Sequence, residues 1–477
     1  MKKVIFIFAI ILTALTSCEK DAPIDNIKDK PISKIHGDNE YDVLGFAFDA
    51  TKEYLDINSP LLQVIDVEQL KANTDLIITH YPTQTILDIQ SGHNEKDLLV
   101  KFNNKFSAKT PLPINGVPFS GTFNSEITVS NKIVSKYSHA MANVNVYVAH
   151  HAIMKEASIE ILQNYLTTQF KNNIQNMTPE QLISVYGTHV YTDIYTGGSV
   201  RFKYKSIITN NNKELSVAYG AKLTLEELLK SSFELSNDTK LDVTSKSEFK
   251  DESVIYKSRG GATGVSIFGV WTPGTTIQPI NFNQWSSTVK RSEANALQLI
   301  DIGDNSLIAL YEFVADPAKK AALKTAIENY LVSKSISLIP VVPLYRYKHR
   351  STGNHFYTTD WTELGNGNSS WEYIKIEAFV CETQLENTVP FYRFYRTYKK
   401  FLGKTYFNHY YTRTYSSGTQ NYGFERIQCY VYPTNLNGTT PLYQTWNPDL
   451  HDHFYTTNTS EIPAGYGSKT ECGYVYK

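Results

Sequence analysis

The sequence predicts an α+β body followed by an all-β tail. Three observations carry this prediction. Strand-like and helix-like segments alternate up to about residue 335, 19 of the 33 tyrosines lie after Pro340, and the tyrosine-rich part contains three copies of one motif. With 477 residues, 41% of them hydrophobic and 19% charged, the chain has the composition of a folded protein of about three domains.

The charge balance narrows the choice of partners. The formal net charge is −1, whereas nucleic-acid binding needs a basic surface. We therefore expect no nucleic-acid partner. The same lack of net positive charge argues against binding to a membrane by electrostatic attraction alone.

The N-terminus has the pattern of an export signal. Lys2 and Lys3 precede the apolar run Val4 to Leu15, which is too short for the ~20 residues that cross a bilayer as a helix. The small residues Thr16-Ser17 before Cys18 look like a bacterial lipoprotein cleavage site. We expect a signal peptide at 1–17, lipid on Cys18 and a tether over 18–40. An ordinary signal peptide with an incidental cysteine is the alternative.

Local patterns divide the body into elements. Alternation of polar and apolar residues predicts strands at 44–49, 143–149 and 200–205, and an apolar run follows at 265–271. Helical spacing predicts helices over 158–170, 223–235 and 317–331, and a further helix that starts at Thr178-Pro179. Asp316 before Pro317 has the pattern of an N-cap.

Residues 186–198 are the most informative stretch of the chain. Tyr186-Gly187 ends a run of helical spacing, so the glycine predicts a helix stop. Thr188 and His189 follow, and we interpret His189 as a buried structural histidine. Gly197-Gly198 at the opening of the next strand predicts a bend or a close backbone approach. A second pair, Gly260-Gly261, precedes the run at 265–271.

The aromatic-Gly-Thr-His element followed by a double glycine resembles the signature of the membrane attack complex/perforin (MACPF) superfamily. The resemblance extends over residues 41–335, because the Gly-aromatic start near Gly45, the stretch Glu53-Tyr54 and the order of strands and helices also match. It implies a bent antiparallel sheet with flanking helical clusters. It also implies a protein that oligomerises on a target membrane and refolds helices into pore-lining β-hairpins.

Two segments are long enough to form such hairpins. One crossing takes ~9–11 residues, so a hairpin needs at least ~20; residues 118–137 and 207–256 meet this length. Val200, Phe202 and Tyr204 share one face of a strand whose other face is basic, which suits a strand with lipid on one side and water on the other. A strand with one solvated face in a soluble protein has the same pattern.

The tail repeats a Tyr…His-aromatic-Tyr-Thr motif, beginning at Tyr345, Tyr392 and Tyr443. We expect a three-repeat, trefoil-like β domain over 341–477. The motif also resembles a repeat module of secreted bacterial proteins, which implies carbohydrate or cell-surface binding. Shared core packing is the alternative for aromatics at matching positions. The candidate glycan-binding residues are Tyr345, Tyr357, Tyr392, Tyr411, Tyr443, Trp446 and Tyr455.

No serine elbow, phosphate loop or zinc-helix motif occurs, so we expect no enzyme, no cofactor and no metal. Two of Cys381, Cys429 and Cys472 could form a disulfide in an exported protein, and the spacing leaves the pairing open. The whole pattern resembles secreted antimicrobial lipoproteins of Bacteroides-like bacteria. We expect a lipid-anchored surface protein that binds a glycan or receptor, forms a homo-oligomer and perforates a target membrane. A non-lytic adhesion or glycan-binding lipoprotein is the alternative.

Overall fold

The structure is a computed structural model, and it describes residues 41–477 except 56–59, 107–118, 124–127, 130–131, 210–212, 230–248, 277–278, 294–295, 305, 336, 400–402, 404 and 416–421. The expected signal peptide, Cys18 and the tether lie outside the described residues, as do parts of both expected hairpin segments. Within the described residues, no helix is long and apolar enough to cross a membrane.

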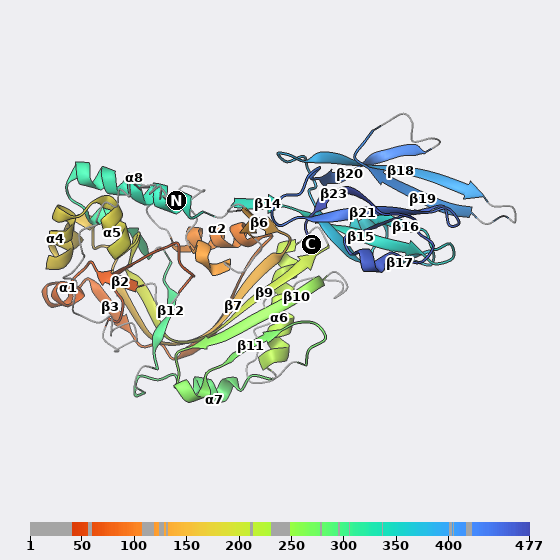
Figure 1. Ribbon diagram of the computed structural model, residues 1–477. Helices are drawn as coiled ribbons and strands as arrows, with labels where there is room; N and C mark the ends of the chain where they lie inside the picture. The colour runs from red at the N-terminus through yellow and green to blue at the C-terminus, as the bar shows by residue number, and fades with distance from the viewer. Residues whose placement is uncertain are drawn as a thin grey trace, which may run out of the picture. The chain divides into compact units, whose positions relative to one another are not determined.

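A large antiparallel sheet organises the body (Figure 1). Its strands run in the order β11-β10-β9-β7-β3, while β12 also pairs with β9 and β4 with β7. The bounds are β3 Ile77–His80, β4 Gln84–Gly92, β7 Ser138–Ile153, β9 Asp193–Ile208, β10 Phe249–Arg259, β11 Phe268–Trp271 and β12 Gln298–Ile302. The long strands β7 and β9 each contain 16 residues, and they form the middle of this sheet.

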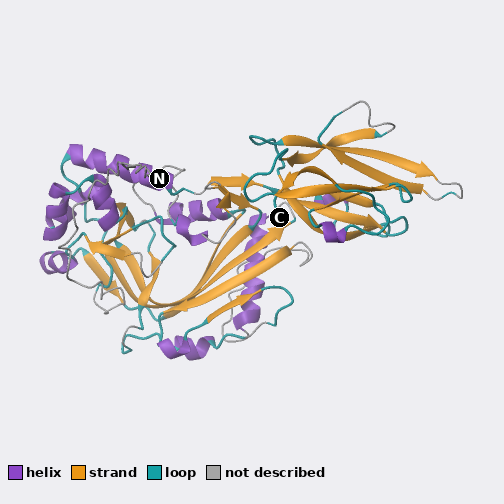
Figure 2. Cartoon of the chain, in the orientation of Figure 1, coloured by secondary structure: helices purple, strands orange, loops and turns teal. Residues whose placement is uncertain are grey.

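Eight α-helices of the described residues flank the sheets (Figure 2). They are α1 Val67–Asn73, α2 Glu95–Phe106, α3 Ile159–Asn164, α4 Thr168–Asn176, α5 Pro179–Tyr186, α6 Lys213–Leu229, α7 Phe282–Ser286 and α8 Pro317–Ser333. The helix starts at Thr178 and Asp316 are confirmed. Thr178 forms a capping box with Gln181, and the Asp316 carboxylate accepts the Lys319 N–H at 2.8 Å.

The helix expected over 158–170 is wrong as a single element. The chain leaves the helix at Tyr165, and Leu166 forms a β-bridge with Ile65. Thr167 then caps the new helix α4 by accepting the Phe170 N–H at 3.2 Å. Helical spacing continued across this break because the two short helices bury apolar residues in the same core.

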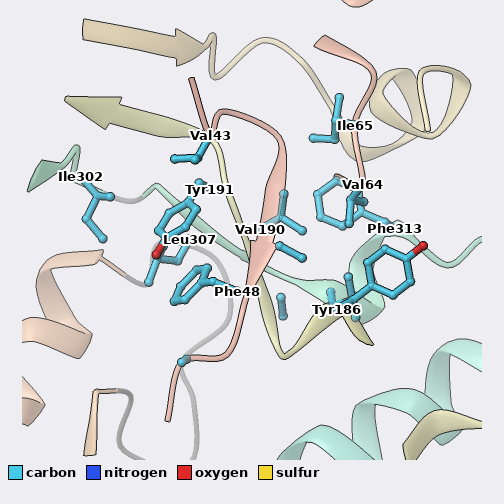
Figure 3. Close-up of a cluster of buried hydrophobic side chains, with 14 of the residues drawn as sticks. Val43, Phe48, Val64, Ile65, Tyr186, Val190, Tyr191, Ile302, Leu307 and Phe313 are labelled. Carbon is cyan, nitrogen blue, oxygen red and sulfur yellow. The ribbon is translucent and has the colours of Figure 1, made fainter. Parts of the chain in front are cut away.

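Two smaller sheets complete the body. One has the order β13-β8-β1-β2, with β1 Phe46–Phe48, β2 Pro60–Gln63, β8 His189–Tyr191 and β13 Leu307–Ala309. The other combines β5 Thr128–Val129, β6 Lys132–Ser135 and β14 Ser337–Pro340. Large buried side chains gather around the first of these sheets, where Phe48 stacks on Tyr191 with ring centroids 4.1 Å apart (Figure 3).

The tail gives one three-stranded antiparallel sheet per repeat, which confirms the all-β, three-repeat prediction. In each sheet the first strand of the repeat lies in the middle. The sheets are β15 Val342–His349, β16 His355–Thr358 and β17 Trp371–Val380; β18 Val389–Lys399, β19 Thr405–Thr412 and β20 Gly423–Val431; and β21 Thr440–Asn447, β22 Asp452–Thr456 and β23 Thr470–Val475. The extra residues of repeat 2 lengthen the hairpin of β18 and β19, which pair as far as Lys399 and Thr405.

Candidate functional site: the bend of the central sheet

The segment Tyr186 to His189 joins helix α5 to strand β8. Gly187 ends the helix with φ +70°, and a Cβ at this position would lie 2.5 Å from the Phe48 carbonyl carbon and oxygen. Glycine is therefore required both by the backbone conformation and by the close approach. The predicted helix stop is confirmed.

The polar side chains of this segment form hydrogen bonds with groups around it. Thr188 Oγ1 accepts the Ala50 N–H at 3.0 Å and lies 2.9 Å from His189 Nδ1. Tyr186 is buried at the core shown in Figure 3, and its hydroxyl accepts a hydrogen bond from the Asn173 amide at 3.0 Å. Burial lowers the pKa of His189 to about 4. The imidazole is thus neutral at physiological pH and enclosed, which suits the structural role expected from the sequence.

The two glycine pairs meet at one point of the sheet. Gly197 and Gly198 lie inside β9, not at its start, because the strand already begins at Asp193. Strand β9 pairs with β12 up to Gly197 and with β10 from Ser199 onward, so the glycines mark the exchange of partners. A Cβ on Gly260 would lie 2.5 Å from the Gly197 carbonyl oxygen.

Trp285 of α7 closes this glycine junction, which we define as Gly197, Gly198, Gly260 and Gly261. The indole N–H donates to the Gly260 carbonyl oxygen at 3.0 Å. A Cβ on Gly198 would lie 2.9 Å from the indole ring, and one on Gly261 would lie 2.8 Å from its nitrogen. The predicted close backbone approach is confirmed. Its partners are the Val146 carbonyl oxygen of β7, which would lie 2.0 Å from a Cβ on Gly197, the second glycine pair and this indole.

Two long connections join neighbouring strands of the central sheet, at the strand ends that lie away from the glycine junction. One joins β4 to β7 through residues 93–137 and includes α2, while the other joins β9 to β10 through residues 209–248 and includes α6. The expected hairpin segment 118–137 falls within the first connection, which is longer because it also contains α2. The segment 207–256 contains the second connection and the strand ends on either side of it.

The strand face expected to meet lipid is buried in this conformation. Val200, Phe202 and Tyr204 are 0–2% exposed and pack in one cluster with Val217 and Leu225 of α6. Strand β9 is a central strand, with neighbours on both sides. The alternating pattern of β9 therefore corresponds to two covered faces. Helix α6 covers the apolar face, and the stretch Glu53-Tyr54 covers the basic face.

The stretch Glu53-Tyr54 lies over the basic face of β9. The sequence indicated this stretch only as part of the resemblance. The Glu53 carboxylate lies 2.6 Å from Lys203 Nζ, 3.6 Å from Arg201 and 3.9 Å from Arg259. These cations favour its charged form and hold the pKa of Glu53 below its usual value, although partial burial acts in the opposite direction. The alternation of basic residues along β9 indicates that this face needs an acidic partner. It does not show that the partner is Glu53, which is distant in the sequence.

Ring stacking and polar contacts hold α2 in place. Phe102 and Phe106 stack on Tyr54 with centroids 4.7 and 5.4 Å away. Glu95 lies 3.0 Å from His139 of β7, and both side chains are buried. On the surface, Lys101 forms an ion pair with Glu214, which joins the helix of the first connection to that of the second.

In the tail, the repeated tyrosines form a closed ring of hydrogen bonds. The hydroxyl of Tyr357 donates to the Tyr455 carbonyl, that of Tyr455 to the Tyr411 carbonyl, and that of Tyr411 to the Tyr357 carbonyl, at 2.6–2.9 Å. Each hydroxyl also accepts a backbone N–H from the ring at 2.8 Å. The ring is the centre of the threefold core.

Burial corrects four of the glycan-binding candidates, the three tyrosines of this ring and Tyr345. Tyr345, Tyr357, Tyr411 and Tyr455 are at most 2% exposed, so no glycan can stack on them. A repeat motif places residues at equivalent positions but does not say whether the position is core or surface. Tyr392, Tyr443 and Trp446 are partly exposed and remain candidates.

The three tail cysteines, Cys381, Cys429 and Cys472, are buried free thiols in this structure. Burial raises the pKa of the Cys381 thiol to about 11. Among the residues that the structure describes, no group of three His, Cys, Asp or Glu side chains could hold a metal ion.

Comparison with known proteins agrees with this architecture. The MAC/Perforin domain model matches residues 77–338. A domain of unknown function (DUF5648) matches residues 325–420 and 406–469, a region that begins in α8 and covers most of the tail. None of the curated proteins matches the sequence.

Two similar solved structures span most of the chain. A MAC/perforin-domain protein of Bacteroides thetaiotaomicron is 18% identical over 69% of this chain and 67% of its own, with a TM-score of 0.49. GNIP1Aa of Chromobacterium piscinae is 12% identical over 91% of this chain and 82% of its own, with a TM-score of 0.48. The family model covers more than half of the sequence and the expected bent sheet lies within it, so this chain belongs to the MAC/perforin family.

Proposed function

We propose that the protein is an exported, lipid-anchored pore-forming toxin that acts on bacteria. Its tail binds a glycan or receptor on the target surface, copies of the chain oligomerise there, and the two long connections refold as hairpins that enter the membrane. Cys18 carries the lipid, and the protein sits at the outer membrane or cell surface. Its action needs no enzymatic chemistry.

The observation that carries this proposal is the pairing of each long connection with the strands that would extend into it. Residues 93–137 join β4 to β7, and residues 209–248 join β9 to β10. The two strands of each pair are directly hydrogen-bonded antiparallel neighbours in the sheet. The apolar face of β9 is covered by α6, which belongs to the second connection. Release of α6 would expose Val200, Phe202 and Tyr204. It would also make the connection 209–248 available to lengthen β9 and β10.

A cross-link between the two connections tests the proposal. Lys101 and Glu214 form an ion pair and are each 35% exposed, so cysteines at these positions accept a reducible bifunctional thiol reagent. The tail cysteines Cys381, Cys429 and Cys472 are buried and react slowly. We expect the cross-linked K101C/E214C protein to release no dye from loaded vesicles or sensitive cells, and to recover when the link is reduced.

The matched control is K324C/E328C, an exposed i,i+4 ion pair within α8. This link stays inside one helix and should leave dye release intact. Equal leakage from both cross-linked proteins contradicts the proposed refolding. Binding of glycans without leakage on every membrane tried favours the non-lytic adhesion protein instead.

A further inference from the structure

The three tail repeats are not equivalent at one position. In repeat 1 the Tyr347 hydroxyl donates to the Gly365 carbonyl at 2.8 Å. In repeat 3 the Thr445 hydroxyl makes the same bond to Gly467, also at 2.8 Å. Repeat 2 has Phe394 at this position, two residues after its first tyrosine, and phenylalanine has no hydroxyl to donate. Phe394 therefore cannot make the hydrogen bond that ties the sheet to the following loop in repeats 1 and 3.

Aromatic side chains gather where the tie is missing. Phe394 is paired with Tyr410 on β19 and with Phe424 on β20, and cross-strand partners lie on the same face of a sheet. Tyr415 packs against this face, with its ring centroid 5.3 Å from Tyr392, 5.9 Å from Phe394 and 5.3 Å from Phe424. We call Tyr392, Phe394, Tyr410, Tyr415 and Phe424 the repeat 2 aromatic face.

Part of this face is open to solvent, unlike its counterpart, whereas Phe394 at its centre is only 3% exposed. Tyr415 is 60% exposed and Phe424 46% exposed. In repeat 1, Trp361 occupies the position equivalent to Tyr415, and it closes over the buried Tyr345 with centroids 4.8 Å apart. Exposed aromatic rings in contact with one another are costly to leave in water, and such patches usually mark a binding site.

Charge distinguishes repeat 2 in the same way. Residues 389–432 contain seven Lys or Arg and one Glu, whereas residues 342–381 contain four basic and four acidic residues and residues 440–477 contain two and four. Several of these cations are engaged away from the aromatic face: Arg393 and Arg426 form ion pairs with Glu363, and Arg413 donates to the Pro433 carbonyl oxygen. Arg396 lies two residues after Phe394 on β18 and so on the same side of the sheet, with its guanidinium carbon 4.3 Å from the Tyr398 ring centroid. The repeat with the partly open aromatic face thus also presents a cation on that face.

We propose that the repeat 2 aromatic face binds an anionic oligosaccharide, with one site per chain. Pyranose rings present an apolar C–H face that stacks on aromatic rings, and basic side chains attract carboxylate, sulfate or phosphate groups on the sugar. The proposal deepens the glycan binding of the proposed function and rests on it. It moves the site away from the threefold-repeated tyrosines and onto the one repeat that departs from the symmetry.

The test is calorimetric binding of the full chain to polygalacturonate and heparin oligosaccharides, with neutral dextran oligosaccharides for comparison. We expect the two anionic sugars to bind, dextran to bind at least tenfold more weakly, and affinity to fall as salt rises. Tyr415→Ala and Phe424→Ala should each weaken binding about tenfold, a typical effect of losing one stacked ring. Leu436→Ala, at an exposed position between repeats 2 and 3, is the control and should bind normally.

Three results would overturn the proposal. The first is unchanged affinity in both aromatic variants while their circular dichroism and melting match the parent. The second is an equal loss in Tyr443→Ala, which would place binding in repeat 3 as well. The third is binding to phosphatidylglycerol vesicles through Tyr415 and Phe424 without any binding to the oligosaccharides. None of these results depends on dye release, so the glycan site can fail while pore formation stands.

Discussion

Gly260→Ala should destabilise the body because the glycine junction leaves no room for a methyl group. Gly260 has φ +68°, and its Cβ would lie 2.5 Å from the Gly197 carbonyl oxygen and 2.7 Å from that of Ala296. The left-handed backbone alone costs a non-glycine residue about 1 kcal/mol or somewhat more. Forcing the two strands apart adds about 1–3 kcal/mol. The total loss of unfolding free energy should be about 2–4 kcal/mol.

Gly274→Ala separates the two contributions. Gly274 also has a positive φ, +88°, but a Cβ there meets nothing within 4 Å. This variant should lose only the backbone contribution of about 1 kcal/mol. Urea unfolding of both variants, followed by tryptophan fluorescence and circular dichroism, measures the difference. Equal losses in Gly260→Ala and Gly274→Ala would refute the tight contact between the two glycine pairs.

Two further predictions concern the buried polar groups. Burial lowers the pKa of three histidines below the ordinary 6.5, to about 4 for His189 and His453 and about 3 for His409, where the charge of Arg393 adds to the effect. In this pH range the unfolded chain binds protons that the folded chain does not. The free energy of unfolding should therefore fall as pH drops from about 6.5 to 4, by up to about 3 kcal/mol per histidine. Unfolding midpoints that stay constant over this range would contradict the burial of these histidines. Tyr411→Phe removes the hydroxyl that accepts the Tyr357 N–H and donates to the Tyr357 carbonyl. Both groups stay buried without this partner, so the tail should lose about 2–4 kcal/mol, and a melting temperature unchanged from the parent would show that the ring is not essential.

Local signals in the sequence predicted local features well. The caps at Thr178 and Asp316 and the helix stop at Gly187 depend on residues within one turn, so their patterns are readable from the chain alone. The close approach at Gly197-Gly198 was also predicted, because only a missing side chain allows it. Its partner was not predicted, since Gly260 and Trp285 are distant in the sequence.

The sequence was less informative where the same pattern fits two environments. Alternation in β9 looked like a strand with one wet face, but both faces are covered, one by α6 and the other by Glu53-Tyr54. Equivalent tyrosines in three repeats looked like three binding positions, yet Tyr357, Tyr411 and Tyr455 point to one centre. The departure from the repeat at Phe394, which is itself buried, lies beside the exposed rings of Tyr415 and Phe424.

The central claim, that the second connection changes from helix to membrane strand, is tested most directly by a fluorescence scan of α6. Single cysteines from Gly220 to Leu229 would carry an environment-sensitive dye, read in solution and after addition of target membranes. In solution the more exposed positions should have helical spacing, because Leu223, Glu226 and Glu227 are partly or fully exposed at i, i+3 and i+4 while the other positions from 220 to 229 are buried. On membranes we predict a two-residue alternation between lipid and water. A helical period that persists on membranes that leak would contradict the account.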